Sequence, residues 1–471
     1  MSTTPTRKIG LWAAIATAVG IVVSSSAMVS LGEGFGLGGR GFIIAMIAAF
    51  ALNLCVAFSF AELSGMIPRA GGLNRYTAPA LGSTVSMIAV ISGYVLVTLF
   101  AGSAEAGIAG LVVSDVFGLD AEPLLISLLF VAALVVVNIF SVKVYGAVQI
   151  ILATALILSI AVLGIIGLTG LGAGEPVTTE LPINPLGAGV LSLTALAFWL
   201  FIGVEFITPL AEELRRPRLY LPLAMILGLL IIFAADILFG FGALNYLLPE
   251  QLAGSPNPHL LAAEALAGPV GVLWMGIMTF LATASTLNTL MIAIPRMLAA
   301  QAEEGEMPSI LARRNRFGAP WVAVLVLGVM FVLFLLTGFT DGESIITFIL
   351  ASVFCWVLAY IIAHLNVIVL RIRHPHAERS FRSPLGLTFQ VVGILGMLFV
   401  MANISGDADQ AAEIYSTVLI LLGITAIYSV VWVKFVMKKG IFEVTPLEEI
   451  RKPPGTVQES AGSAQGSSVT T

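Results

Sequence analysis

Four acidic side chains lie inside long apolar stretches of the sequence: Glu62, Glu105, Glu205 and Asp236. A charge at the centre of a membrane helix costs on the order of 3 kcal/mol, so such a position needs a compensating partner. A buried carboxyl group can pair with an arginine, hold a cationic ligand or carry a proton. These four residues are therefore the first candidates for a functional site.

Glu105 lies midway along the apolar stretch 83–113. Its neighbours in the sequence are small: Gly102, Ser103, Ala104, Ala106 and Gly107. Small neighbours leave room for a ligand, so Glu105 is a candidate partner for a substrate ammonium. The alternative is a protonated carboxyl group that is hydrogen-bonded to a neighbouring helix, because burial raises the pKa of a carboxyl group.

Three other ionisable residues in the apolar stretches, Glu62, Asp236 and His364, are interpreted mainly as structural. Glu62 lies near the end of its apolar stretch, and we expect it to pair with a basic residue such as Arg69. Asp236 is either a proton relay or a helix contact, and the second reading is favoured. His364, on an apolar stretch, is expected to be packed and hydrogen-bonded.

Two apolar stretches contain residues that interrupt a helix. In the stretch 9–31, Gly20 precedes three consecutive serines, Ser24, Ser25 and Ser26, whose side chains compete for backbone hydrogen bonds. In the stretch 188–211, Gly203 and Glu205 interrupt an apolar run. Either break alone is compatible with close helix packing. Paired breaks in two halves of a chain, however, are typical of a transporter binding site at the membrane midplane.

The elements that must position these residues are membrane-spanning helices. The chain has 471 residues, of which 58% are hydrophobic and 10% are charged, against roughly 25% charged in a soluble domain. This composition excludes a soluble globular fold. Apolar stretches predict twelve spanning helices, near 9–31, 41–66, 83–113, 123–142, 144–170, 188–211, 219–246, 268–300, 320–340, 344–370, 384–406 and 412–433.

The basic residues predict the orientation of the chain. With the N-terminus in the cytoplasm, every Lys and Arg except Arg40 falls on the cytoplasmic side. The sequence thus predicts a multi-pass protein of the cell (inner) membrane with both termini cytoplasmic. The outer loops are acidic; they either concentrate cations or, as we favour, are simply solvated. Residues 1–439 are expected to form the membrane domain and residues 440–471 a disordered cytoplasmic tail.

Several motifs resemble the amino acid, polyamine and organocation (APC) transporter superfamily. They occur in the order and spacing of that superfamily: Ala61-Glu62-Leu63 before Pro68-Arg69-Ala70-Gly71-Gly72, Phe201-Ile202-Gly203-Val204-Glu205, Arg296-Met297-Leu298 before Glu304-Gly305 and Pro308, and Gly318-Ala319-Pro320. The resemblance implies an all-α, LeuT-like fold of two inverted repeats of five helices, with helices 1 and 6 broken and helices 11 and 12 peripheral.

The resemblance also implies roles for residues at the two breaks. A substrate carboxylate would meet backbone N–H groups at Ser24, Ser25 and Ser26, which occupy the place of a Gly-Ser-Gly motif in the superfamily. The substrate amine would meet the carbonyl groups of Val22 and Ile202, beside Gly203. Trp199 resembles an aromatic gate, and Glu205 resembles a residue that couples the substrate to that gate.

Two departures from the superfamily pattern bear on the substrate and on coupling. Ser24 and Ser26 add side chains where a carboxylate approaches glycine backbone in relatives. The lysine that some relatives carry midway along helix five is absent from the stretch 149–156, and Lys143 lies too close to the cytoplasmic end to replace it. Coupling to protons would therefore need a carboxyl group.

These observations predict a secondary active transporter that moves amino acids or related amines, by cation symport or by exchange. The coupling ion would be a proton or sodium. The first alternative is a carrier of a polyamine or another amine without a carboxylate, which would use Glu105. A channel and a ligand sensor that kept the fold are lower alternatives. No enzymatic activity, cofactor, metal site or nucleic-acid partner is predicted.

Overall fold

The structure is a computed structural model that describes residues 9–67, 72–118, 121–140, 146–180, 182–336 and 342–451. Within these ranges the chain forms helices and turns but no β-strand. An isolated parallel bridge joins Ile9 to Leu214. The predicted all-helical architecture is therefore confirmed for the described residues.

In its described residues, the first half of the chain contains nine α-helices. They are α1 (Leu11–Val22), α2 (Ser25–Gly38), α3 (Phe42–Met66), α4 (Leu73–Leu81), α5 (Ser83–Val90), α6 (Val97–Phe117), α7 (Pro123–Ile139), α8 (Gly146–Leu168) and α9 (Thr194–Trp199). A π-helical turn (Ile91–Leu96) joins α5 to α6, so these two helices form one long rod.

The second half begins with a 3₁₀ helix, η4 (Val204–Glu213), which follows α9 after a turn. The α-helices that follow are α10 (Pro217–Ala243), α11 (Pro249–Ala253), α12 (Pro258–Glu303), α13 (Trp321–Leu336), α14 (Gly342–Arg373), α15 (Thr388–Ala402), α16 (Ala408–Val431) and α17 (Leu447–Arg451).

The helices have the length and composition of membrane spans. In the described residues, 8 helical stretches are long and apolar enough to cross a membrane, and there are four shorter apolar helices. One face of α16 exposes Ile420, Ile424 and Ile427 at helical spacing, with 62%, 59% and 68% of each side chain exposed. Such a face suits lipid rather than water. The count of twelve spans and the inverted repeat stay predictions.

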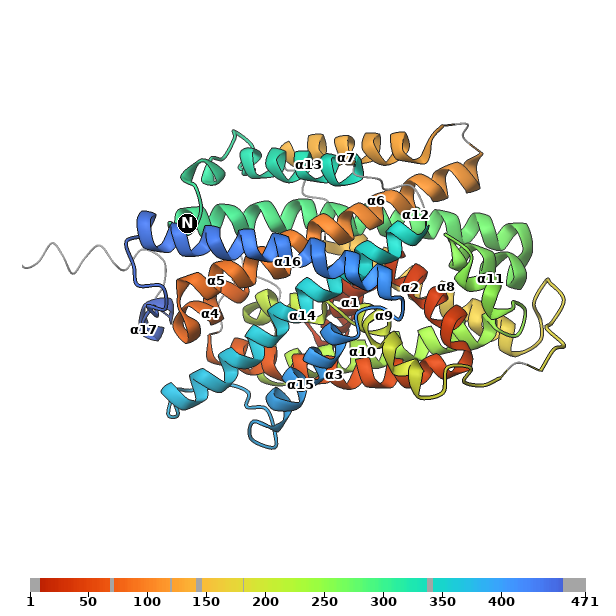
Figure 1. Ribbon diagram of the computed structural model, residues 1–471, viewed down its shortest axis with the longest axis horizontal. Coiled ribbons are helices and arrows are strands. Elements are labelled where there is room, and N and C mark those ends of the chain that lie inside the picture. Colours follow the sequence, from red (N-terminus) through yellow and green to blue (C-terminus); the bar gives the residue numbers. More distant parts are fainter. Residues whose placement is uncertain are drawn as a thin grey trace, which may run out of the picture.

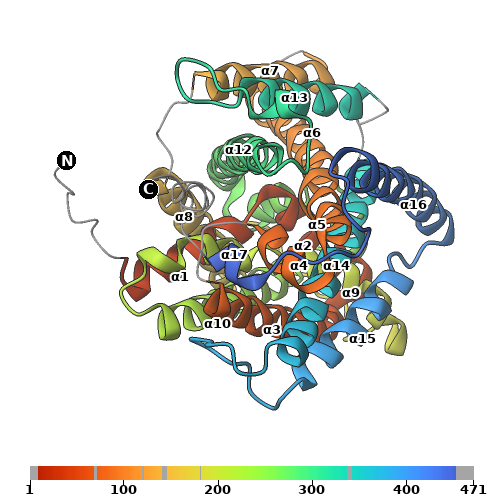
Figure 2. The ribbon, with the colours of Figure 1, turned by 90° about the vertical axis from the view of Figure 1, so that its left-hand side faces the viewer.

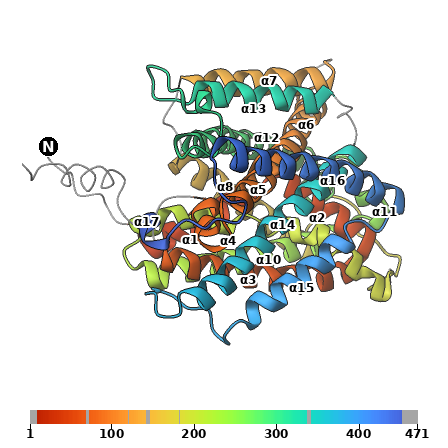
Figure 3. The same ribbon diagram turned by 60° about the vertical axis from the view of Figure 1, so that its left-hand side comes forward.

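Helix α2 lies in the middle of the helices, and every one of its side chains except Glu33 and Leu37 is buried. Figure 2 shows α7 and α13 at one edge of the molecule and α15 and α16 near another. Figures 1 and 3 place α3 and α10 on the side opposite α7 and α13. The serines of the first break are therefore carried into the interior.

Glycines allow two of these helices to approach closely. A Cβ atom added at Gly164 of α8 would lie 2.4 Å from the carbonyl carbon of Leu238 in α10. One added at Gly167 would lie 2.4 Å from the carbonyl oxygen of Gly242. The backbones of α8 and α10 therefore pack directly on each other, as small residues permit in membrane helices.

Both predicted helix breaks are confirmed. Val23 and Ser24, between α1 and α2, have extended backbone, with Ser24 at φ −133° and ψ 167°. Between α9 and η4 the chain turns, and Gly203 has a φ of 112°, a conformation that L side chains rarely adopt. The first break begins at Val23, three residues after Gly20, because Ser24 caps the helix that follows.

Several helices outside the predicted spans were missed. Helix α4 precedes the third span and is separated from α5 by Gly82, whose φ is 90°. Helix α11 and the first ten residues of α12 precede the eighth span, and Gly268, with a φ of 62°, marks the kink where that span begins. These segments mix polar and apolar residues, so a search for long apolar runs does not detect them.

The described part of the C-terminal segment is packed rather than free. The N–H of Thr445 donates to the carbonyl oxygen of Ala78 in α4, at 3.1 Å. Leu447 in α17 is 6% exposed, which buries an apolar anchor against the membrane domain. The expected division into a membrane domain (1–439) and a disordered tail (440–471) stays a prediction, and residues 452–471 lie outside the described residues.

Candidate functional site

Two of the three serines of the first break bind the carboxylate of Glu105. The backbone N–H of Ser26 donates to Oε1 of Glu105 at 3.0 Å, and the Ser26 hydroxyl donates to the same oxygen at 2.6 Å. The Ser25 hydroxyl donates to Oε2. Glu105 comes from α6 and is 1% exposed. The long sequence separation between these residues means that tertiary packing alone brings them together.

Hydroxyl groups extend this cluster on both sides. Thr283 of α12 lies 2.6 Å from Ser25, from Oγ1 to Oγ. The Ser25 proton is used on Glu105, so Thr283 donates to Ser25. Ser24 lies 3.0 Å from Ser26 through their hydroxyl oxygens, and it accepts from the N–H of Ala27 at 3.3 Å. We call Ser24, Ser25, Ser26, Glu105 and Thr283 the serine–glutamate cluster.

Trp199 joins the second break to this cluster. It is the last residue of α9, and its indole Nε1 donates to the Ser26 hydroxyl oxygen at 3.0 Å. Its ring packs edge-to-face on Trp356 of α14, with the ring centroids 6.1 Å apart. Trp199 is 7% exposed, and its ring contacts both Ser26 of the cluster and Trp356.

Glu205 lies on the far side of the two tryptophan rings and does not enter the cluster. Its Oε1 accepts from Trp356 Nε1 at 3.1 Å, and its Oε2 accepts from the Tyr360 hydroxyl at 2.7 Å. The N–H of Gly203 donates to the same hydroxyl at 3.3 Å. Glu205 thus fixes the second break to α14, and its nearest link to Glu105 runs through Trp356 and Trp199.

Val22 and Ile202 lie at the ends of their helical segments. Val22 is the last residue of α1, and Ile202 lies in the turn after α9. Both are 4% exposed. The carbonyl group of Val22 lies in the last turn of α1 and so lacks a partner within that helix. Ile202 lies three residues after the end of α9.

The other buried carboxylates have different surroundings. Glu62 accepts from Nε and NH2 of Arg371 at 2.7 and 2.5 Å, and Arg379 lies 3.4 Å away. The expected arginine pairing is therefore present, although Arg69 lies outside the described residues. Asp236 in α10 is 1% exposed, and neither of its oxygens has a hydrogen-bond partner in the described part of the chain.

His364 agrees with its expected structural role. It is fully buried in α14, and its Nδ1 lies 2.8 Å from the Ser59 hydroxyl of α3. Lys143 lies outside the described residues.

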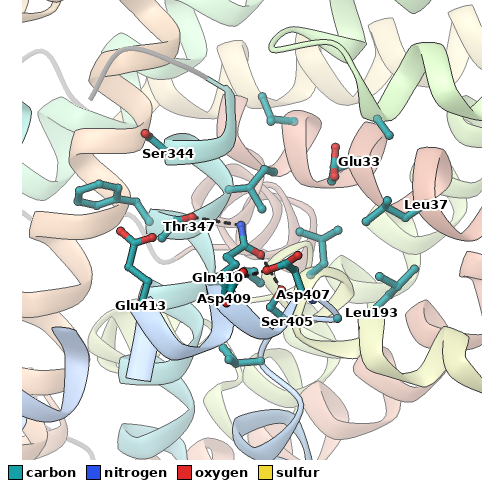
Figure 4. Close-up of a pocket in the computed structure, with 18 of the residues that line it drawn as sticks. Glu33, Leu37, Leu193, Ser344, Thr347, Ser405, Asp407, Asp409, Gln410 and Glu413 are labelled. Carbon is teal, nitrogen blue, oxygen red and sulfur yellow. Dashed lines mark hydrogen bonds between the residues drawn. The ribbon is translucent and has the colours of Figure 1, made fainter. Parts of the chain in front are cut away.

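A large cavity lies near the serine–glutamate cluster, although no residue of the cluster lines it. It has a volume of about 1800 Å³ and lies between α2, α9, α14 and α16. Val29 of α2 and Leu196 of α9 line it, one helical turn beyond Ser26 and one before Trp199. Figure 4 shows Glu33, Asp407, Asp409 and Glu413 around this cavity, which we call the vestibule. The vestibule is therefore acidic, and its lining ends about one helical turn from Ser26 along α2 and from Trp199 along α9.

Sequence reasoning missed three residues of this arrangement. Thr283 has no signal in the sequence beyond being a hydroxyl in an apolar span. Trp356 and Tyr360 are four residues apart and so share a helix face, which is a usable signal. The sequence does not indicate, however, that this face meets Glu205.

Comparisons with known proteins agree with this architecture. A family model described as amino acid permease matches residues 9–431. The serine/threonine exchanger SteT of Bacillus subtilis is 25% identical and aligns with 84% of this chain and 91% of its own length. The branched-chain amino acid permease BcaP of the same organism is 22% identical, over 84% of this chain and 88% of its own length.

The name of a eukaryotic relative refers to a different substrate. The S-adenosylmethionine permease GAP4 of Candida albicans is 27% identical, over 82% of this chain and 66% of its own length. The match of the family model covers nearly all of the described helices. The chain therefore belongs to the amino acid permease family of the APC superfamily.

Proposed function

We propose that this permease is a secondary active transporter of amino acids or related amines, working by alternating access. The observation that carries the proposal is the hydrogen bond from Trp199, just before the second break, to Ser26 in the buried polar cluster at the first break. Free helix ends at such a break bind the charged groups of a small substrate. The names of SteT and BcaP, which refer to amino acids, support the same substrate range.

In this proposal the two breaks divide the work. Ser24, Ser25, Ser26 and Glu105 form one half of the binding site, and the carbonyl groups of Val22 and Ile202 receive the substrate amine beside Gly203. Trp199 is the gate, because its indole bonds to Ser26 and must move before a substrate can reach the cluster. Glu205 couples that movement to α14 through Trp356 and Tyr360.

The second candidate is a carrier of a polyamine or another amine without a carboxylate. It is favoured by the burial of a carboxylate, Glu105, inside the cluster itself. An acidic vestibule also raises the local concentration of cations.

The test uses purified protein in liposomes with labelled amino acids and amines, under separate proton and sodium gradients. Import by cation symport predicts saturable uptake that follows one of the two gradients. Exchange predicts uptake that requires unlabelled substrate inside. Flux that does not saturate would indicate a channel. Ligand binding in detergent without any flux in liposomes would indicate a sensor; either result would overturn the proposal.

We further propose the predicted orientation in the cell membrane, with both termini cytoplasmic. A reporter fused after Lys439 should be active only in the cytoplasm, and one inserted near Glu180 only outside. Opposite locations would reverse the proposed orientation.

A further inference from the structure

We propose that Glu105 takes the place of a substrate carboxylate, so that the permease selects amines that lack one. This inference rests on the proposed transport function and specifies its substrate class. Its central observation is that the anion position of the first break is already filled by a side chain of the protein.

The N-terminus of α2 is the anion position. The first N–H groups of a helix have no partner within the helix and carry a partial positive charge, which attracts carboxylates. Here the N–H of Ser26 is bonded to Glu105 at 3.0 Å, and the N–H of Ala27 is bonded to the Ser24 hydroxyl at 3.3 Å. A substrate carboxylate that bonded to these two N–H groups would have to displace both Glu105 and the Ser24 hydroxyl.

The hydrogen bonds around Glu105 all run towards its oxygens. The Ser26 hydroxyl proton is used on Oε1, so Ser26 can only accept from Trp199 and Ser24. The Ser25 hydroxyl proton is used on Oε2, so Thr283 must donate to Ser25. The cluster is thus arranged to hold a carboxylate supplied from α6.

The charge of Glu105 has no cationic partner in the described residues. The ion pairs described here involve Glu62, Glu303 or Glu304 instead. Oε1 of Glu105 accepts two hydrogen bonds, whereas Oε2 accepts only one, from Ser25. One acceptor direction on Oε2 therefore remains for a substrate ammonium.

A carboxylate on the substrate would be disfavoured in this arrangement. It would place two negative charges at one helix N-terminus, and like charges close together in a buried site repel strongly. The hydroxymethyl groups of Ser24 and Ser26 also narrow the approach to the backbone. Charge and shape therefore select the same class, a small amine with no carboxylate.

The experiment compares an amine with the amino acid that differs from it only by a carboxylate. Suitable pairs are isobutylamine with valine, phenethylamine with phenylalanine and cadaverine with lysine. Wild-type protein in liposomes should take up the amine of at least one pair about tenfold to a hundredfold better in kcat/KM, the range expected for one charged hydrogen-bonded contact. Preference for cadaverine alone would restrict the class to diamines.

Two variants of Glu105 separate the effect of its negative charge from the effect of its occupying the Ser26 N–H. Glu105→Ala should lose amine uptake and gain uptake of the matched amino acid, because the Ser26 N–H becomes free. Glu105→Gln should lose amine uptake without that gain, because its amide oxygen still occupies the N–H. Asp236→Asn removes another buried carboxyl group outside the cluster and should leave the preference unchanged.

The outcomes distinguish this inference from the transport proposal. Preference of the wild type for the amino acid of every pair would overturn the inference and leave transport intact. The absence of saturable uptake for all substrates, by monodisperse wild-type protein, would overturn transport itself. If the Glu105 variants do not fold, the unfolding temperature of the wild type is measured with each member of a pair. Only the amine should raise it, and a rise with the amino acid instead would overturn the inference.

Discussion

Glu62 and Glu105 are the same residue type, nearly equally buried at 2% and 1% exposure, yet they lie in opposite environments. Glu62 is held by two arginines, and it also accepts from the N–H and the hydroxyl of Ser383. Glu105 is held by hydroxyl and N–H groups alone. A carboxylate that is neutralised within the protein is structural, whereas one without a counter-charge is available to a cationic ligand.

The hydrogen-bond network around Glu62 connects three helices. Arg371 belongs to α14 and Glu62 to α3, while Ser383 lies in the loop before α15. Gln390 of α15 extends the network, donating to Ser59 and to Ser383, both at 3.0 Å. The Glu62 network therefore attaches α15 to α3 and α14.

The largest effect should come from leaving Glu62 without its main partner. Arg371→Met is expected to lower the free energy of unfolding by about 3–5 kcal/mol, because a buried carboxylate loses its counter-charge. Thermal unfolding of the purified protein in detergent measures this loss. Arg75→Met is the matched control, since the side chains of its pair with Glu304 are 29% and 44% exposed and exposed pairs contribute at most about 1 kcal/mol. Equal losses for the two variants would contradict the structural role of Glu62.

A smaller effect is expected at Trp199 in the functional site. Trp199→Phe keeps an aromatic ring but removes the hydrogen bond to the Ser26 hydroxyl. Transport should fall by about tenfold, the size of one buried hydrogen bond of about 1.4 kcal/mol, while the unfolding temperature changes little. Trp274→Phe removes an indole bond to Ser159 outside the cluster and should not change transport. Equal changes in both variants would remove Trp199 from the gate.

Glu306 is a buried glutamate that has neither the arginine partners of Glu62 nor the several hydrogen-bond donors of Glu105. It lies after the end of α12, is 5% exposed, and accepts from Gln301 at 3.2 Å. Burial raises the pKa of Glu306 to about 7, helped by the charge of Glu304 and opposed by Gln301 and Lys439. The folded protein therefore binds a proton that the unfolded chain, with a lower pKa, releases.

The stability contributed by protonated Glu306 is complete at pH values below its unfolded pKa and is lost as the pH rises through about 7. Between about pH 6 and 8 we expect the free energy of unfolding to fall by about 1 kcal/mol. Thermal unfolding at a series of pH values measures this change. Glu306→Gln should remove this pH dependence. An unchanged slope in the variant would assign the titration to another group.

The smallest effect on stability should be that of Glu105→Gln, under about 1 kcal/mol. Its amide oxygen can accept from Ser26, and its amide nitrogen can donate to Ser25, so the cluster stays satisfied. A nearly unchanged unfolding temperature, together with lost amine uptake, would separate function from stability at this site. A loss as large as that of Arg371→Met would instead make Glu105 structural.

Much of the architecture could be predicted because it depends on local composition. Long apolar stretches locate the helices, and the serines at 24–26 and Gly203 locate the breaks. The sequence also predicts that Glu105 lies midway along the third span. Helix α4 and the helical start of α12 were not, since their mixed polarity gives no signal of lipid contact.

The partners of the buried carboxylates could not be predicted in the same way. Glu105 meets Ser26 across 79 positions of sequence, and Thr283 meets Ser25 across 258. A pattern along one helix shows which residues share a face, but not which other helix that face will meet. Glu62 paired with Arg371 rather than with a neighbour in sequence for the same reason.

The sequence by itself therefore determined a helical membrane protein with interrupted spans and four carboxyl groups that need compensation. These properties follow from the cost of placing charge and unbonded backbone in lipid, which acts on each segment separately. Only the tertiary structure decided that Glu62 is neutralised by arginines while Glu105 rests on a helix N-terminus. Helix packing sets those distances, and the distances decide which carboxylate remains available to a substrate.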